Sequence, residues 1–202
     1  PVSITGLYSM EIDAIEDYLG EYIDQRFDHE KVKQNPALAH LAESVRYGVF
    51  SGGKRFRPLL AVLTAEVLEK DPKWVLPFSA AIEFVHSYSL IHDDLPLMDN
   101  DDFRRGQPTN HKVYGEDVAL LAGDGLLTEA FHILAQGYKD QAELSVLLVS
   151  LVSEAAGFLG MVGGQALDIA ALKASQPSLS DLDLVHQMKT GALIAVSIEG
   201  AA

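Results

Sequence analysis

The sequence contains no cysteine among its 202 residues. Disulfide bonds, cysteine-ligated zinc, iron–sulfur clusters and thiol nucleophiles are therefore excluded. Basic residues are also scarce, because 15 lysines and arginines stand against 29 aspartates and glutamates, for a formal net charge of −14. Nucleic acid is bound through basic surfaces, so we expect no nucleic-acid partner.

Targeting and membrane signals are weak. Pro1 to Met10 lacks a basic start followed by an apolar run, so the sequence predicts no secretory signal and a cytoplasmic location. The stretch from Leu144 to Val162 is apolar enough to be considered as a membrane span. Glu154 lies at its centre, and a charge there costs about 2.5–3.5 kcal/mol on insertion scales. We therefore interpret the stretch as a buried core helix and predict no membrane span.

The chain has the pattern of a helical protein. Long stretches are rich in Ala, Leu, Glu and Lys, and β-branched alternation is scarce, which favours helix over strand. We predict helices at about 8–30, 36–50, 58–70, 74–95, 117–135, 140–164 and 181–200, with a polar loop at 173–180. No repeat and no linker interrupts this pattern, so residues 1–202 are predicted to form a single all-α domain.

The densest chemical signal follows the fourth predicted helix. Five carboxylates lie within the ten residues from Asp93 to Asp102, and Arg104-Arg105 follows. Crowded carboxylates repel one another unless a cation holds them, and hard oxygen ligands suit magnesium. Magnesium shares its shell with substrate phosphates, which adjacent arginines are suited to clamp. We interpret the run as a metal–phosphate site, and a solvated acidic turn is the alternative.

A second signal is Gly52-Gly53-Lys54-Arg55-Phe56-Arg57-Pro58. Three cations lie beside a glycine pair where a helix is expected to start, so backbone amides, helix dipole and cations could jointly hold an anion. The glycine spacing and the missing Lys-Ser/Thr pair exclude a P-loop. We interpret the loop as a phosphate site, although basic loops are also common on surfaces.

A third signal consists of Gly163-Gly164-Gln165 with Asp168, and of Lys189-Thr190-Gly191 downstream. Glycine inside an apolar helix costs about 1 kcal/mol relative to alanine, so it usually serves close packing or a kink. Gln165 and Lys189 are polar groups on otherwise apolar helices. Spacing alone slightly favours satisfied core polar residues over a functional role.

Two other metal-binding helical proteins are alternatives. Glu83 with His86 and Glu129 with His132 form Glu-x-x-His pairs, which are half of a di-iron carboxylate site. Candidates for the two further glutamates are Glu43, Glu66 and Glu154. His92-Asp93 could instead be the metal-binding doublet of an all-α phosphohydrolase. Its further ligands would come from His86, His111 and His132. Both alternatives leave the Lys54 loop unexplained, and a non-enzymatic partner-binding bundle would need none of these clusters.

With these motifs in this order, the chain resembles the trans-isoprenyl diphosphate synthases, and most closely the bacterial farnesyl diphosphate synthases (geranyltranstransferases). The resemblance runs from about Ala39 to the end of the sequence. It implies an antiparallel helix bundle around a deep central cavity, the isoprenoid synthase fold. It also implies Mg²⁺ as cofactor, isopentenyl diphosphate and an allylic diphosphate (dimethylallyl or geranyl) as substrates, and a homodimer.

The resemblance also suggests a role for each motif residue. Lys54, Arg57, His86 and Arg105 look like the contacts of isopentenyl diphosphate. Asp93 and Asp99 look like magnesium ligands with Asp94 in support, and Arg104 looks like the clamp on the allylic diphosphate. Lys189, Thr190 and Gln165 look like the groups that face the allylic substrate and its cation.

Product length should follow cavity depth, which the residues about one turn before Asp93 control. They are Ser89 and Tyr88. In the family an aromatic residue there accompanies short products, so we expect C15 farnesyl diphosphate, with C20 geranylgeranyl diphosphate as the alternative.

The sequence departs from the family in one respect. Members normally carry a second Asp-Asp-x-x-Asp motif on a later helix, and no such motif follows Asp102. Asp181 and Asp183 precede Lys189 and do not fit it. We therefore expect the sequence to be incomplete at its C-terminus and the 202 residues alone to be inactive or severely impaired. We also expect the apolar faces of Leu144–Val162 and Leu193–Ile198 to lack cover, unless a dimer interface hides part of them.

Overall fold

The computed structural model describes residues 4–173 and 179–202. Its first helices are α1 (Ile4–Leu7), α2 (Ser9–Phe27), α3 (Glu30–Gln34), α4 (Pro36–Phe50), α5 (Phe56–Val67) and α6 (Pro72–Asp93). A short hairpin of β1 (Phe103–Arg104) and β2 (Gln107–Pro108) follows. The remaining elements are α7 (Asn110–Tyr114), α8 (Glu116–Gly137), α9 (Ala142–Ala156), α10 (Met161–Lys173), α11 (Leu179–His186), the π-helical turn η1 (Gln187–Gly191) and α12 (Ala192–Glu199). The predicted all-α class is confirmed.

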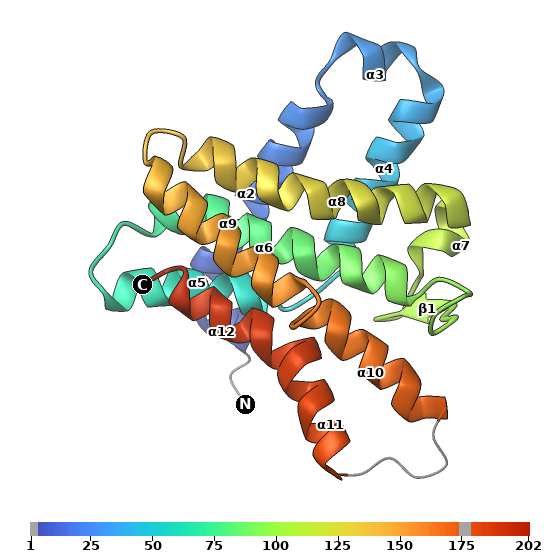
Figure 1. The fold of residues 1–202 in the computed structure, drawn as a ribbon. Helices are drawn as coiled ribbons and strands as arrows, with labels where there is room; N and C mark the ends of the chain where they lie inside the picture. Colours follow the sequence, from blue (N-terminus) through green and yellow to red (C-terminus); the bar gives the residue numbers. More distant parts are fainter. Residues whose placement is uncertain (1–3, 174–178) are drawn as a thin grey trace.

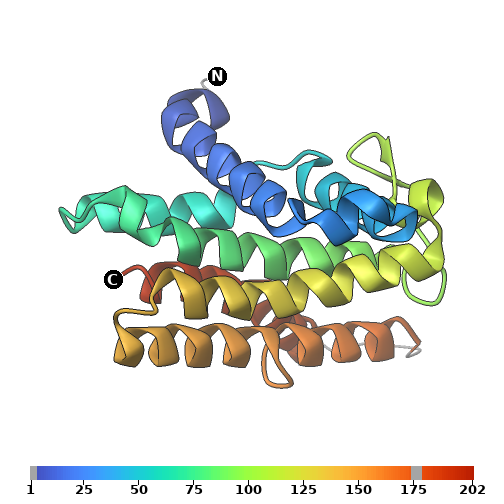
Figure 2. The ribbon, with the colours of Figure 1, turned by 90° about the horizontal axis from the view of Figure 1, so that it is seen from above.

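Helix α6 lies at the centre of the bundle (Figures 1 and 2). It packs against α5 and α8. Helices α2 and α4 lie on one side of α6 and α8, and helices α9 and α10 lie on the other side. Phe78, Ile82, Phe84 and Val85 are completely buried, so α6 is apolar on nearly all sides, as a helix enclosed by others must be. The central position of α6 fixes the side chains at its C-terminal end relative to the rest of the bundle.

Two helix starts follow from local chemistry. The side chain of Asn35 accepts a hydrogen bond from Ala37 N at 3.0 Å, and that of Asp71 accepts one from Lys73 N at 3.0 Å. A proline occupies the first turn after each cap, where its missing N–H costs nothing. The start predicted at residue 36 is confirmed, and α6 begins two residues earlier than predicted.

Several predicted boundaries are wrong. The single helix predicted at 140–164 is two helices, because a turn at Gly157 to Gly160 separates α9 from α10. A side chain on Gly160 would overlap the carbonyl group of Ala155. The helix predicted at 8–30 ends at Phe27, and the one at 181–200 is divided by η1. The hairpin was not predicted, and residues 174–178 of the predicted loop lie outside the described part of the chain.

Two stretches, Glu116–Gly137 and Ala142–Ala171, are long and apolar enough to cross a membrane by length and composition. The first is α8, which packs against α4, α6, α7 and α9. The second contains the Gly157 to Gly160 turn. The first stretch therefore packs as a bundle helix, and the second is not one continuous helix.

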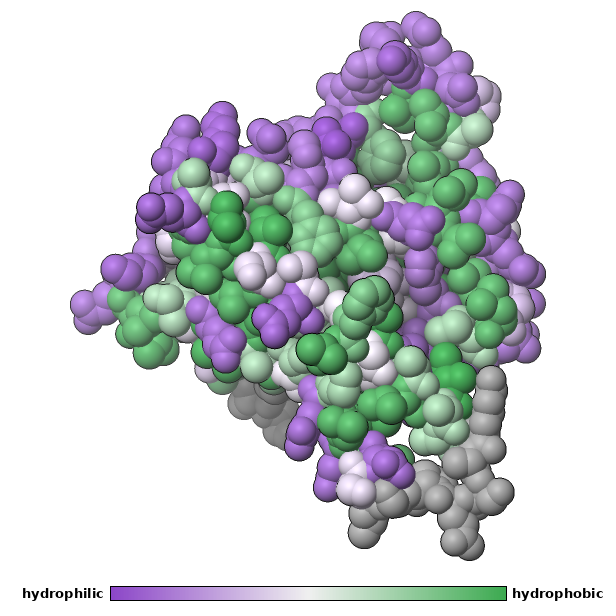
Figure 3. Space-filling view, viewed as in Figure 1, coloured by the Kyte–Doolittle hydropathy of each residue, from purple (hydrophilic) through white to green (hydrophobic). Residues whose placement is uncertain are grey.

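Apolar side chains gather on one face of the molecule, over α9, α10 and α12 (Figure 3). Phe158 and Leu159 are 88% and 81% exposed, and Val146 and Leu147 on α9 are more than half exposed. The lack of cover expected for Leu144 to Val162 is thus observed on one face of this stretch, so the interpretation as a buried core helix is only half right, because Leu148 and Val152 are buried. In the other segment expected to lack cover, Leu193 and Val196 are buried and Ile198 is 43% exposed.

Candidate active site

A cavity of about 400 Å³ lies between the end of α6, helix α10 and η1. Helix α6 contributes Tyr88, Ser89 and Asp93. Helix α10 contributes Gln165 with the apolar Met161 and Ile169, and η1 contributes Lys189 and Thr190. The structure therefore brings Asp93 of the aspartate motif and three polar residues of the third sequence signal to one site, here called the apolar cavity. Asp94, Asp99 and Arg104 are not among the residues that line it.

A second cavity of about 480 Å³ adjoins the first. We call this space the cationic cavity. It is lined by Gly53, Lys54, Phe56, Arg57, Glu83, His86 and Arg105. Arg57 and His86 also line the apolar cavity, so the two spaces share a wall. All four residues predicted to contact isopentenyl diphosphate lie here.

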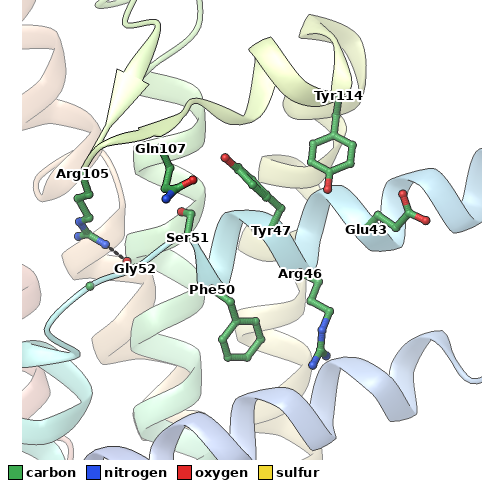
Figure 4. A pocket seen from close by; sticks show the side chains of 10 residues that line it. Glu43, Arg46, Tyr47, Phe50, Ser51, Gly52, Arg105, Gln107 and Tyr114 are labelled. Atoms are coloured by element: carbon green, nitrogen blue, oxygen red, sulfur yellow. Dashed lines mark hydrogen bonds between the residues drawn. The ribbon is translucent and has the colours of Figure 1, made fainter.

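The backbone of the Gly52 loop needs its glycines. Gly52 and Gly53 have φ values of 95° and 152°, which residues other than glycine rarely adopt. Arg105 donates a hydrogen bond to the carbonyl oxygen of Gly52, and a Cβ on Gly53 would lie 2.6 Å from Arg105 Nη1. Figure 4 shows this contact beside a further, open cavity lined by Tyr47 and Tyr114. The glycines let the hairpin arginine come close to the loop.

Burial and like charges set the electrostatics of the cationic cavity. The Nε atom of Arg57 is buried without a hydrogen-bond partner. Burial lowers the pKa of Arg57 and that of Arg105. Burial, reinforced by the neighbouring Arg57 and Arg105, lowers the pKa of His86 to about 3. His86 is therefore a neutral imidazole at pH 7. Arg57 Nε is a buried, unpaired hydrogen-bond donor that is suited to an anion.

The aspartate motif folds back on itself at the mouth of the apolar cavity. Asp99 N donates to Asp93 O at 2.8 Å. Burial raises the pKa of Asp93 to about 6, with further contributions from Asp99 and Asp94 that Lys189 and Arg104 oppose. Carboxylates that repel one another in a partly buried place favour a bound cation. Oxygen donors of this kind fit Mg²⁺.

Asp94 and Arg104 form an ion pair with each other. Arg104 Nε lies 3.0 Å from both carboxylate oxygens of Asp94, and Arg104 Nη2 lies 2.7 Å from one of them. The Asp94 side chain is 5% exposed. Asp94 thus holds the arginine predicted to clamp the allylic diphosphate. Nowhere in residues 4–173 and 179–202 do three or more Asp, Glu or His side chains form a ready-made metal cluster, so waters and substrate oxygens would complete any magnesium shell.

Helices α10 and η1 meet closely at the third signal. A Cβ on Gly164 would lie 2.8 Å from Lys189 Cα. Lys189 Nζ lies 2.6 Å from Asp168 Oδ2. Both amide atoms of Gln165 are buried without a partner. The interpretation of Gln165 as a satisfied core residue is therefore wrong, and the close helix contact explains the glycine.

The alternative metal sites do not form within the described residues. Glu83 is paired with Arg55, and Glu129 is paired with Arg26 and accepts a hydrogen bond from Tyr22. The candidate glutamates Glu43, Glu66 and Glu154 are exposed. His92 Nε2 lies 3.0 Å from Leu120 O, and His111 Nδ1 lies 3.1 Å from Thr109 Oγ1. Neither the di-iron site nor the phosphohydrolase site is therefore assembled in the described part of the chain.

Sequence reasoning missed two features of the site. The first is that Glu83 lines the cationic cavity. Its place three residues before His86 could have indicated this, because residues i and i+3 share a helix face. Met161 and Ile169 line the apolar cavity, and nothing in their spacing separates them from ordinary core residues.

Comparison with known proteins agrees with the geometry. The family model for polyprenyl synthetase matches residues 38–202. The farnesyl diphosphate synthase of Geobacillus stearothermophilus is 43% identical over 203 residues, which cover 100% of this chain and 65% of that protein. The geranylgeranyl diphosphate synthase of Cyanophora paradoxa is 40% identical over 88% of this chain and 59% of that protein. The chain thus spans less than two thirds of the length of these relatives.

A solved structure shares the fold. The geranyltransferase from Legionella pneumophila matches with a TM-score of 0.89 and 35% identity, over 96% of this chain and 66% of that one.

Proposed function

The chain belongs to the polyprenyl synthetase family, and we propose that it is a trans-prenyltransferase that joins isopentenyl diphosphate to dimethylallyl or geranyl diphosphate. The observation that carries the proposal is the pair of adjoining cavities, one cationic and one apolar, that share Arg57 and His86. A condensation of two diphosphates needs two anion sites whose hydrocarbon ends meet, and this arrangement provides them.

Isopentenyl diphosphate would occupy the cationic cavity. Lys54, Arg57 and Arg105 supply charge, and the neutral His86 supplies a hydrogen-bonding group. Arginine suits phosphate because its planar fork donates two parallel hydrogen bonds. Bound at Arg57 and His86, the diphosphate would leave its alkenyl chain in the apolar cavity.

The allylic diphosphate would lie at the mouth of the apolar cavity, near Asp93. Asp93 and Asp99 would hold Mg²⁺, which when bound neutralises negative charge on a diphosphate. Asp94 would keep Arg104 oriented through their paired hydrogen bonds. Lys189 is 28% exposed at the same mouth and would meet the leaving diphosphate as a second cation.

The reaction itself needs little from side chains beyond binding and shielding. The allylic C–O bond breaks and the diphosphate departs with the electron pair. The double bond of isopentenyl diphosphate then attacks the allylic carbon, and the departed diphosphate accepts the proton lost from the adjoining carbon. Met161 and Ile169 would keep water from the carbocation, and the oxygen atoms of Gln165 and Thr190 would stabilise it.

The wall of the apolar cavity favours a short product. Tyr88 is 6% exposed, and its ring packs edge-on against His92 with centroids 5.6 Å apart. We propose farnesyl diphosphate as the main product, with geranylgeranyl diphosphate as the alternative. We further propose a homodimer that works in the cytoplasm. Turnover by these 202 residues alone should be low, because they lack the second aspartate motif.

The proposal is tested by incubating the protein with isopentenyl diphosphate, geranyl diphosphate and Mg²⁺ and identifying products by mass. A C15 diphosphate supports farnesyl diphosphate synthesis, and a C20 diphosphate supports the alternative.

Binding gives a second test that needs no turnover. Geranyl diphosphate should bind in a Mg²⁺-dependent manner, and D93A should weaken that binding at least tenfold. D140A, which removes an exposed carboxylate that lines neither cavity, should bind like the wild type. Binding that ignores both Mg²⁺ and D93A would refute the assignment of Asp93.

A further inference from the structure

The cationic cavity contains a carboxylate that the proposed reaction does not use. Glu83 is 4% exposed and lies among Lys54, Arg57 and Arg105 in the cavity lining. It is the single acidic residue of that lining. An anion in this place repels the diphosphate that the cavity is suited to bind. Its presence therefore calls for a physical reason.

Glu83 is held by a buried arginine. Arg55 Nη1 donates to Glu83 Oε1 at 2.6 Å, and Arg55 Nε donates to Glu16 Oε1 at 2.5 Å. Arg55 is 3% exposed. Glu16 lies outside the cavity lining and its side chain is 36% exposed. The two glutamates thus share one arginine, but only Glu83 reaches the cavity.

The charge of Glu83 also affects Arg57 and Arg105. Its charge raises the pKa of Arg57 and of Arg105, against the lowering by burial. Burial in turn raises the pKa of Glu83, and Arg55, Arg57 and Arg105 oppose that rise. Arginines keep their protons in proteins, and buried like charges are costly without a counter-charge.

We propose that Glu83 is the resident counter-anion of the cationic cavity. It stabilises Arg57 and Arg105 in place while no diphosphate is bound, and it weakens diphosphate binding by repulsion once the ligand supplies its own negative charge. Glu83 is thus a positioning residue that balances stability of the ligand-free protein against affinity. This inference rests on the proposed diphosphate site.

The test compares E83Q with E16Q. Each variant removes one negative partner of Arg55 and keeps the size of the side chain. The probe is isopentenyl diphosphate without Mg²⁺, and the readouts are its Kd by calorimetry and the Tm with and without it. E83Q should lower the Tm of the ligand-free protein, bind the probe roughly tenfold more tightly because a nearby like charge is gone, and gain more Tm from the probe than the wild type.

E16Q should leave the Kd within about twofold of the wild type, because Glu16 does not line the cavity. Equal Kd values for E83Q and E16Q, or weaker binding by E83Q, would show that Glu83 merely anchors Arg55 and would overturn the inference. If E83Q does not fold, E83D withdraws the carboxylate from the cavity, and it should tighten binding by a smaller factor. Unchanged or weaker binding by a folded E83D also overturns it.

The two proposals fail in different ways. If the wild type does not bind isopentenyl diphosphate, the diphosphate site itself is refuted and the inference falls with it. If the wild type binds and E83Q binds no more tightly, the diphosphate site stands and only the role of Glu83 is refuted.

Discussion

Replacing Tyr88 with alanine should deepen the apolar cavity. Tyr88 lies five residues before Asp93, which is about 7.5 Å along the axis of α6 at 1.5 Å per residue. Its ring is buried in the wall of a cavity of about 400 Å³. The phenol ring that the substitution removes has more heavy atoms than one isoprene unit. We therefore expect Y88A to accommodate an allylic chain one unit longer.

The substitution should also cost stability. Replacing a large buried aromatic residue by alanine costs about 3 kcal/mol or more in a closed core, and Tyr88 adjoins a cavity, so about 2–3 kcal/mol is expected here. For a chain of this size that corresponds to a fall in Tm of roughly 4–12 °C. Circular dichroism establishes that Y88A is folded before its ligand preference is measured.

Two assays check the change in length. Products of Y88A, identified by mass, should shift from C15 to C20. Binding of farnesyl diphosphate relative to geranyl diphosphate, which needs no turnover, should rise at least tenfold. Y88F is the matched control, because it keeps the ring and should keep the wild-type preference. A folded Y88A with an unchanged product and an unchanged preference would refute the argument that Tyr88 limits the cavity.

Two further predictions concern the walls of the site. The pKa of His86 is about 3 in the folded protein and about 6.5 in an unfolded chain. The unfolded state therefore binds more protons between pH 3 and 6.5, and stability falls as the pH drops through this window. Urea unfolding should show that H86Q loses about 2 kcal/mol less than the wild type between pH 7.5 and 5, and equal losses would contradict a buried neutral His86. G164A should destabilise the protein by about 1–3 kcal/mol because its Cβ would press on Lys189, as overpacking does. In contrast G125A, whose Cβ meets nothing within 4 Å, should be neutral or stabilising, and equal effects of the two would refute the close helix contact.

The sequence allowed the fold class to be predicted, and its limits have local causes. Helix starts with an Asn or Asp cap before proline are local events, so Pro36 was placed correctly. Two glycines mark the turn at Gly157 to Gly160, but glycine also occurs inside apolar helices, so they did not divide the predicted helix. The π-helical turn η1 was missed because single-residue propensities do not distinguish π from α geometry.

The candidate site was predicted by residue and not by arrangement. The motif residues are local in sequence, so each could be named. Whether Arg57 and His86 share one wall between two cavities depends on how α5 and α6 pack, which spacing does not determine. In the same way, the pairing of Asp94 with Arg104 requires the hairpin to fold back, because ten residues separate them.

Helix α6 explains why the site needs so many separate segments. Glu83, His86 and Asp93 follow one another at i, i+3 and i+10, so they share a helix face over about 15 Å. None of the α6 residues that line the two cavities is a lysine or an arginine. Every lysine and arginine of those linings comes from outside α6: from the loop at Lys54, from Arg57 at the start of α5, from the hairpin at Arg105 and from η1 at Lys189. A buried central helix that carries Glu83 and Asp93 among these cations helps to hold them in place before ligands bind. A bound diphosphate would then join these segments to α6 through Mg²⁺ at Asp93 or through a hydrogen bond at His86. Charge complementarity and the position of α6 would together determine where both substrates lie.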